Sequence, residues 1–338
     1  MNILQQTVRR LERLEVLDKV ARPLARAVDR AVRPRVVRNL LSGTDLGHPL
    51  HPVLTDLPIG AWVMSALLDA AGGPAAEGAA DLLVTVGVVA AVPTAAAGLN
   101  DWSDTNGPET RVGLVHATVN TTALSLYLAS VVARARGRRR GGKALGLAGL
   151  GVLTGGAYLG GHLSFGMGVN VNRSAWEQRP SQWTPVLADT ELADGQHRRA
   201  DAGGVPVLLY RTAGTVYALA STCTHMGGPL EEGTISDGCV TCPWPGSTFR
   251  FADGSIVRGP ATTPEPLATP RDRLSGPSRL IRQRSFGPTA TDIRSTESNK
   301  SPRPRAGQTL SLRGLSPGGG CGLGAGVVSG RTWRWRPG

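Results

Sequence analysis

The sequence predicts a multi-domain chain: an α-helical bundle with four membrane spans, a small all-β domain and a disordered C-terminal tail. Four apolar stretches of nearly spanning length follow one another between residues 53 and 163. Short alternating runs come next, and the last part of the chain is rich in Arg, Ser, Pro and Gly without any period. With 338 residues and only four cysteines, a disulfide-stapled small scaffold is excluded.

Residues 1–45 are predicted to form a basic amphipathic helix. Leucine and valine recur every three or four positions among arginines and glutamates. Pro23 is expected to kink or break this helix, because proline lacks the N–H that an interior hydrogen bond needs. Two interpretations remain open: the helix lies on an anionic membrane surface, or it packs on the rest of the chain.

Residues 46–175 are predicted to form a four-helix transmembrane domain. The apolar stretches cover residues 53–71, 82–99, 113–133 and 144–163. Each approaches the ~20 residues that cross the hydrocarbon core of a bilayer. The alternative is a soluble bundle of buried helices, which four consecutive stretches of this length disfavour.

The charge pattern leaves the orientation in the membrane open. The net charge of +12 is carried mostly by arginine, in runs that flank the apolar stretches, which favours an anionic membrane as the partner. The basic loop at residues 134–143 and the basic N-terminal region lie on opposite faces, and both favour the cytoplasm. We expect a multi-pass protein of a bacterial cytoplasmic membrane, with the cytoplasmic side favoured for the β domain.

Residues 182–265 are predicted to form a small antiparallel β domain. Alternating runs at residues 205–210 and 215–219 surround a short turn, and the runs at 247–251 and 255–257 flank Asp253-Gly254. Alternating runs around a short polar turn are typical of β-hairpins. The sequence therefore predicts two hairpins in this domain.

Two short motifs in the β domain carry potential iron ligands, Cys223-Thr-His225 and Cys242-Pro-Trp-Pro245. The spacings Cys-x-His and Cys-x-x-His on two loops are typical of a [2Fe-2S] cluster with two thiolates on one iron and two imidazoles on the other. On these residues the segment resembles a Rieske domain of the ferredoxin type. The resemblance implies a [2Fe-2S] cluster, with Cys223 and Cys242 on one iron and His225 on the other.

The fourth ligand position of this motif is occupied by Pro245. Proline has no side-chain donor, and no histidine follows His225 in the sequence. Cys239 lies three residues before Cys242, so on a strand the two side chains point to opposite faces, and we expect Cys239 to be a buried structural thiol. The cluster is therefore expected to be labile or absent.

The alternating pattern stops after residue 261. A Rieske fold needs closing strands at this point, and residues 267–276 do not show the pattern of a strand. We therefore expect residues 266–338 to be a disordered or frame-shifted tail. In that case Pro245 is explained as a single-base change from histidine in the same damaged region.

Four histidines of the helical half form a possible second site: His48, His51, His116 and His162. Counting the crossings places all four at the membrane face that also carries the β domain. Ligation of a metal or a haem and structural hydrogen bonding are both open for them. With Gly47-His48-Pro-Leu-His51-Pro before its first span, this half resembles an uncharacterised bacterial family of four-helix membrane domains with an HPxHP motif. The resemblance implies an architecture and no activity.

The expected function is membrane-anchored electron transfer through a Rieske-type [2Fe-2S] cluster, impaired by Pro245. The alternative is a redox-inert membrane scaffold or binding protein with a decayed Rieske domain. An electron-transfer protein is favoured over a self-contained enzyme, and an oxygenase is disfavoured because no histidine after His225 remains for a mononuclear iron site. The expected partners are membrane lipids and an unidentified redox partner, and no nucleic acid is expected.

Overall fold

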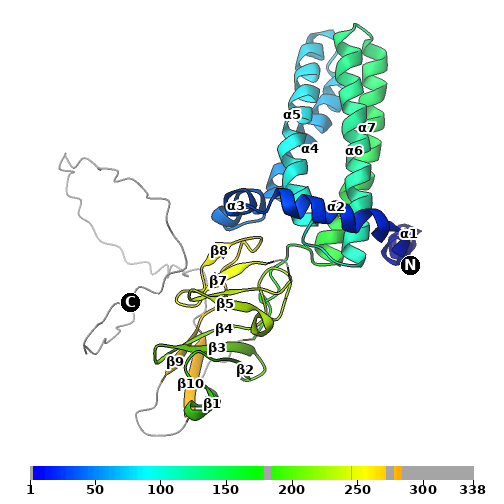
Figure 1. Cartoon of the computed structure of the whole chain (residues 1–338). Helices are drawn as coiled ribbons and strands as arrows, with labels where there is room; N and C mark the ends of the chain where they lie inside the picture. The colour runs from blue at the N-terminus through cyan, green and yellow to red at the C-terminus, as the bar shows by residue number, and fades with distance from the viewer. Residues whose placement is uncertain (1–2, 179–183, 245, 272–277, 284–338) are drawn as a thin grey trace, which may run out of the picture.

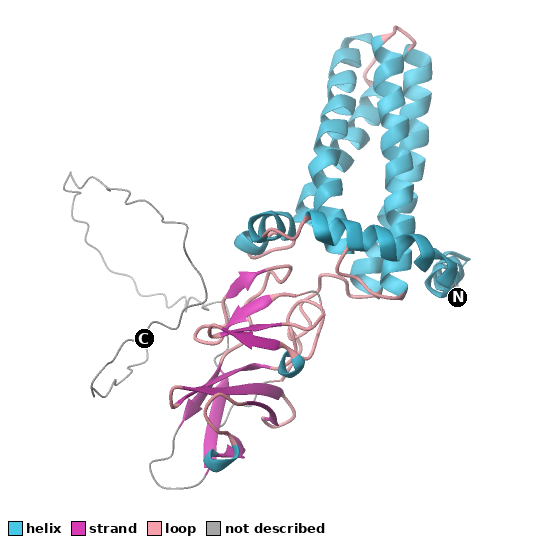
Figure 2. Cartoon of the chain, in the orientation of Figure 1, coloured by secondary structure: helices cyan, strands magenta, loops and turns pink. Residues whose placement is uncertain are grey.

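The computed structural model describes residues 3–178, 184–244, 246–271 and 278–283. A bundle of four long helices lies at one end of the molecule and a β domain at the other (Figure 1). The three N-terminal helices lie across the end of the bundle that faces the β domain, and Figure 2 shows the same division by secondary structure. The helical half and the β half therefore meet at one end of the bundle.

Seven α-helices form the described helical half. The N-terminal three are α1 (Ile3–Arg13), α2 (Asp18–Ala31) and α3 (Arg35–Ser42). The bundle consists of α4 (Leu50–Ala71), α5 (Glu77–Trp102), α6 (Pro108–Ala135) and α7 (Arg139–Gly161). All four bundle helices are long and apolar enough to cross a membrane, which confirms the four predicted helices.

The bundle is built from two equivalent helical hairpins, α4–α5 and α6–α7. Four positions of α4 recur on α6 at an offset of 65 residues: His51 and His116, Trp62 and Tyr127, Ser65 and Ser130, Asp69 and Arg134. Trp62 stacks on Tyr127 with ring centroids 4.0 Å apart, so equivalent residues meet between the hairpins. Ser65 and Ser130 each donate a hydrogen bond to a carbonyl of the second helix in their own hairpin. The two hairpins are therefore related by an approximate two-fold axis along the bundle.

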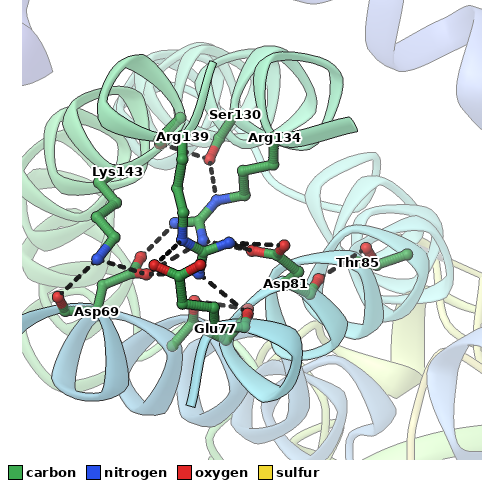
Figure 3. Close-up of polar contacts among 11 residues, drawn as sticks. Asp69, Glu77, Asp81, Thr85, Ser130, Arg134, Arg139 and Lys143 are labelled. Carbon is green, nitrogen blue, oxygen red and sulfur yellow. Dashed lines mark hydrogen bonds and ion pairs between the residues drawn. The ribbon is translucent and has the colours of Figure 1, made fainter. Parts of the chain in front are cut away.

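The end of the bundle far from the β domain is closed by complementary charges (Figure 3). Acidic residues of the first hairpin face basic residues of the second: Asp69, Glu77 and Asp81 against Arg134, Arg139 and Lys143. The positions are equivalent at an offset of 65 residues for α4 and α6 and of 62 residues for α5 and α7. The Arg134 side chain is 3% exposed and forms ion pairs with Asp69 and, at 2.7 Å, with Asp81. The basic connection between α6 and α7 is thus partly neutralised inside the bundle.

Helices α1 and α2 pack on the chain's own bundle. Val8 of α1 is buried against Val112 and Leu159. Arg111 of α6 donates to both carboxylate oxygens of Asp18 on α2, at 2.8 and 2.9 Å. The structure thus supports the second interpretation of this segment, packing on the rest of the chain.

The break in this N-terminal segment lies at residues 14–17, so of the kink or break expected at Pro23 the break is wrong. Helix α1 ends at Arg13, a short 3-10 turn covers Glu15–Leu17, and α2 continues through Pro23. Pro23 and Lys19 are both exposed. The Lys19 carbonyl, which loses its N–H partner at Pro23, can therefore bind water instead.

The β domain contains ten described strands in three antiparallel sheets. The strands are β1 (Thr184–Ala188), β2 (His197–Asp201), β3 (Pro206–Thr212), β4 (Thr215–Ala220), β5 (Thr234–Ser236), β6 (Cys239–Thr241), β7 (Thr248–Arg250), β8 (Ile256–Arg258), β9 (Ala268–Arg271) and β10 (Ser278–Gln283). Their orders are β1-β10-β9, β2-β3-β4 and β5-β6-β7-β8. Both predicted hairpins are confirmed, as β3–β4 and β7–β8. In the first, Ala213 and Gly214 turn the chain with positive φ angles of 49° and 72°.

The expectation that no closing strand follows residue 261 is wrong. Strand β10 pairs with β1 and with β9, and Leu219 bridges to Leu267. Strand β9 was not predicted because it carries Pro270, which is unusual in a strand. An edge strand tolerates proline, because the missing N–H can lie on the side that has no neighbouring strand. The prediction of a disordered or frame-shifted tail beyond residue 283 lies outside the described residues.

The charge cluster generates the first prediction. Arg134→Gln should lower the free energy of unfolding by about 3 kcal/mol, because it leaves the Asp69 and Asp81 carboxylates short of their buried partner. The measurement is a titration of the purified protein from mild detergent into dodecyl sulfate, followed by circular dichroism. Arg136→Gln is the matched control, because Arg136 is exposed. Equal losses in the two variants would contradict the role of the cluster.

The Asp18–Arg111 contact generates a prediction about pH. The hydrogen bond and charge of Arg111 lower the pKa of Asp18 to about 2. A carboxyl whose pKa is lowered in the docked state stabilises that state above its ordinary pKa of about 4, and the contribution is lost as the pH falls towards 2. The distribution of distances between spin labels on α2 and α6 should therefore broaden as the pH falls from 4 to 2. In Asp18→Asn this distribution should stay the same over the window. An unaltered chain whose distribution also stays the same would argue against the contact.

Candidate metal centre and its contact with the helical bundle

Two loops of the β domain bring Cys223 and Cys242 together. The first loop follows β4 and is closed by a hydrogen bond from the Cys223 N–H to the Gly228 carbonyl at 2.9 Å. The second follows β6 and is closed by the Cys242 N–H and the Ser247 carbonyl at 2.8 Å. Both cysteines are free and buried, at 0% and 2% exposure. The loops therefore hold two reduced sulfur atoms in a dry pocket.

The two sulfur atoms share a hydrogen bond. This contact raises the pKa of the Cys223 thiol, which burial raises further, and it lowers the pKa of Cys242. Gly228 shapes the cradle around them, because a Cβ at this position would lie 2.6 Å from Cys242 Sγ and 3.2 Å from the Trp244 ring. Only glycine fits beside the Cys242 sulfur at this point of the loop.

His225 presents an unpaired ring nitrogen in the same loop. Its Nε2 lies 3.1 Å from Asn170 Oδ1, and Asn170 uses its own Nδ2 to donate to Asp101. The imidazole therefore donates from Nε2, which leaves the lone pair on Nδ1. This Nδ1 is buried and has no hydrogen-bond partner in the described part of the chain. Burial lowers the pKa of His225 to about 3, so the ring is neutral.

The donor set fits an iron–sulfur group at three positions. Two cysteine sulfurs and one neutral imidazole nitrogen are the ligand types of a mixed thiolate–imidazole cluster, and the orphaned Nδ1 of His225 is the atom that a metal would satisfy. The fourth position, Pro245, lies outside the described residues. Cys239 is buried in β6 but is disulfide-bonded, so the expected free thiol is wrong and it is not a spare thiolate donor.

Glu265 supports the loop that carries Cys223 and His225, and no feature of the sequence predicts this role. Its side chain is fully buried, and Oε1 accepts a hydrogen bond from the Thr224 N–H at 2.6 Å. The Thr224 hydroxyl donates to the Thr263 carbonyl at 2.8 Å. Burial raises the pKa of Glu265 well above its ordinary value. Thr224, which lies between Cys223 and His225, is thus held through both its backbone and its side chain.

A buried polar network connects His225 to the helical bundle. Asn170 accepts from His225 and donates to Asp101 Oδ2 at 2.7 Å, at the end of α5. Asn100 donates to Asp101 and to Ser42, and it accepts from Arg38 at 3.3 Å. Arg38 of α3 is fully buried and also forms an ion pair with Asp104.

A cavity of about 200 Å³ lies where the two halves meet. It is lined by His48 and Pro49 from the segment before α4, by Asn170 from the connector, and by Thr224 and His225 from the first ligand loop. The edge of His225 that carries Nε2 therefore faces the bundle and this cavity. The HPxHP segment therefore lies across this cavity from the loop that carries Cys223 and His225.

The structure brings two of the four bundle histidines together. The rings of His51 and His116 have centroids 6.4 Å apart and planes that are nearly perpendicular, at 89°. His162 lies apart from them, 3.0 Å from Glu12 of α1, and His48 is exposed beside the Pro49 carbonyl. Among the described residues of the helical half, no group of three or more histidine, cysteine or acidic side chains is arranged to hold a single metal ion.

Comparison with known proteins agrees with this division. Residues 182–275 match the family model of the Rieske [2Fe-2S] domain, and residues 47–173 match that of a predicted membrane protein family (DUF2231). Ferredoxin CarAc of Metapseudomonas resinovorans is 34% identical over 83 residues, which are 24% of this chain and 78% of the relative. The ferredoxin component of biphenyl 2,3-dioxygenase from Rhodococcus jostii (strain RHA1) is 30% identical over 98 residues, 29% of this chain and 90% of the relative.

Among solved structures, the ferredoxin of carbazole 1,9a-dioxygenase from Nocardioides aromaticivorans IC177 aligns with a TM-score of 0.28 and 22% identity, covering 31% of this chain and all of the other. The ligand loops, the family matches and the two ferredoxin relatives thus assign the β half. The chain belongs to the Rieske [2Fe-2S] family, and it carries its Rieske domain C-terminal to a DUF2231 domain.

Proposed function

We propose that this protein is a membrane-anchored electron carrier that works through a Rieske-type [2Fe-2S] centre. The observation that carries the proposal is the buried Cys223–Cys242 pair beside the neutral His225, whose Nδ1 has no partner in the described part of the chain. Both relatives named above, ferredoxin CarAc and the ferredoxin component of biphenyl 2,3-dioxygenase, are ferredoxins by name, which supports a one-electron carrier role here. The four apolar helices support anchoring in a bilayer.

Cys223 and Cys242 would hold one iron and His225 the other, and the cluster supplies reversible one-electron chemistry. The chain's own contribution is structural. Gly228 makes room beside Cys242, and the buried loops exclude water from the sulfur atoms. Asn170 fixes the tautomer of His225, because its Oδ1 accepts a hydrogen bond from the Nε2–H group. The Nδ1 atom therefore keeps its lone pair for a metal.

The docking of the Rieske domain on the bundle supports a particular path for electrons. The Nε2 edge of His225 is covered by Asn170 and lies at the cavity opposite His48 and Pro49. We infer that electrons pass between the cluster and the end of the bundle, with a second redox protein that exchanges electrons from another face. Anchoring of the four helices in a bilayer would hold this contact at the membrane surface.

Pro245 sets the limit of this function. It supplies no side-chain donor at the fourth ligand position, so the iron bound by His225 would depend on solvent or an outside donor. We infer a labile cluster and an impaired carrier in this chain. Pro245 also favours the second candidate function, a redox-inert membrane scaffold with a Rieske fold.

Pro245→His tests the ligand argument. The variant should raise the iron and acid-labile sulfide bound per chain several-fold and should strengthen the low-temperature EPR signal of dithionite-reduced membranes. The control is the same substitution in a Cys223→Ser background, where no gain is expected because a thiolate is also missing. A full complement of stable cluster in the unaltered chain would show that Pro245 does not impair assembly.

Gly228→Ala tests the cradle. A methyl group 2.6 Å from Cys242 Sγ must displace the sulfur, so we expect the iron bound per chain to fall several-fold in the Pro245→His background while the fold is retained. Gly60→Ala is the matched control, since a Cβ there meets nothing within 4 Å. Iron and sulfide analysis measures the bound cluster, and circular dichroism checks the fold. An unchanged amount of iron in Gly228→Ala would show that Gly228 is not needed to make room beside Cys242.

A further inference from the structure

The paired imidazoles of His51 and His116 lie at equivalent positions of the two hairpins, on α4 and α6, close to the approximate two-fold axis. We propose that they are the axial ligands of a haem bound between the hairpins of the bundle. The binding of the haem does not depend on the iron–sulfur cluster. Only its role as an electron partner rests on the function proposed above.

Both imidazoles are held as metal ligands are held. His51 Nδ1 lies 2.9 Å from the Thr94 carbonyl, and His116 Nδ1 lies 2.9 Å from the Gly156 carbonyl. A carbonyl can only accept, so each ring donates from Nδ1 and keeps its lone pair on Nε2. A histidine that donates its other ring N–H to a backbone carbonyl is fixed in tautomer and orientation, as metal-bound histidines are.

The Nε2 atom of His51 has no hydrogen bond in the described part of the chain. Asn120 Nδ2 lies 3.3 Å from both ring nitrogens of His116, and it also donates to the His116 carbonyl at 2.9 Å. Because His116 donates from Nδ1, its Nε2 accepts only this long contact with Asn120, which a bond to a metal would replace. Both lone pairs are therefore available to a ligand between the rings.

Glycines on the second helix of each hairpin make this placement possible. A Cβ at Gly98 would lie 2.7 Å from His51 Cε1, and one at Gly160 would lie 3.0 Å from His116 Cε1. The two glycines are also equivalent under the repeat, because each lies four residues after the residue whose carbonyl accepts from the histidine, Thr94 or Gly156. Each hairpin therefore has the same three features: the histidine, the carbonyl that accepts from it, and the glycine that makes room for its ring.

The number of donors selects the ligand. A bare metal ion held by protein usually needs about four ligands, and no third histidine, cysteine or acidic side chain joins this pair in the described residues. A haem iron carries four nitrogens of its own and needs two from the protein. Bonds of about 2 Å to each imidazole put the centres of two trans rings roughly 6 Å apart, close to the observed 6.4 Å.

The position of the pair suits an electron partner of the Rieske domain. His51 lies in the first turn of α4, two residues after Pro49, which lines the cavity shared with His225. A haem at this level would be the first redox group in the bundle. One electron from the reduced cluster would convert ferric to ferrous haem, with no bond made or broken and no other reactant.

The test uses the full chain, purified in detergent and titrated with hemin. We expect one low-spin, six-coordinate haem per chain, seen in the visible spectrum and in EPR of the ferric form. His51→Ala and His116→Ala should each lower the haem affinity at least about tenfold or leave a five-coordinate high-spin haem. His48→Ala and His162→Ala are matched controls from the same end of the bundle and should behave as the unaltered chain.

Imidazole rescue guards against a misfolded variant. Added imidazole should restore the six-coordinate spectrum of hemin-loaded His51→Gly, which a general loss of fold would not allow. Cys223→Ser should retain the haem, and if it does so without iron–sulfur EPR, the two proposals are separated. The proposal is overturned if the unaltered chain binds no hemin, if His51→Ala keeps a full six-coordinate haem, or if the His48 and His162 controls lose as much haem.

Discussion

The contact on which the rest of the structure depends is the buried guanidinium of Arg38. It is fully buried in α3, it forms an ion pair with Asp104, and it donates to Asn100 at the end of α5. Breaking such a buried pair by removing one partner costs about 3–5 kcal/mol, because the other charge remains unpaired. Through Asn100 the same network continues to Asp101, Asn170 and His225. The position of the loop that carries Cys223 and His225 over the bundle therefore depends on a charge in a helix that precedes both domains.

The surrounding contacts explain why the two halves meet in one orientation. Asn39 of α3 accepts from the Gly259 N–H at 2.9 Å, and Thr44 donates to the Ala261 carbonyl at 3.0 Å. Both contacts join the N-terminal segment to the loop after β8. The N-terminal helices thus lie between the four-helix bundle and the Rieske domain. The edge of His225 that carries Nε2 is turned towards the bundle, which is the basis of the proposed electron path.

Much of the fold could be predicted because it rests on local periodicity and spacing. The four long helices follow from apolar stretches, the hairpins from alternation, and Cys223 and His225 from a motif. The repeat of the hairpins was missed because its charges are inverted, with Asp69 at the position equivalent to Arg134; the recurrence of His51 and Trp62 as His116 and Tyr127 was the available signal. Arg38 and Glu265 were missed because their importance comes from long-range burial, which one sequence does not reveal.

The most direct test of this arrangement is the distance distribution between two spin labels, one at exposed Ser236 of the Rieske domain and one at exposed Thr118 of α6, measured in the otherwise unaltered chain. Rigid docking through Arg38 predicts one narrow distribution, which broadens in Arg38→Leu and stays narrow in the control Arg33→Leu, at an exposed position. A broad distribution in the unaltered chain, or one that Arg38→Leu leaves unchanged, would contradict a Rieske domain held on the bundle by this network.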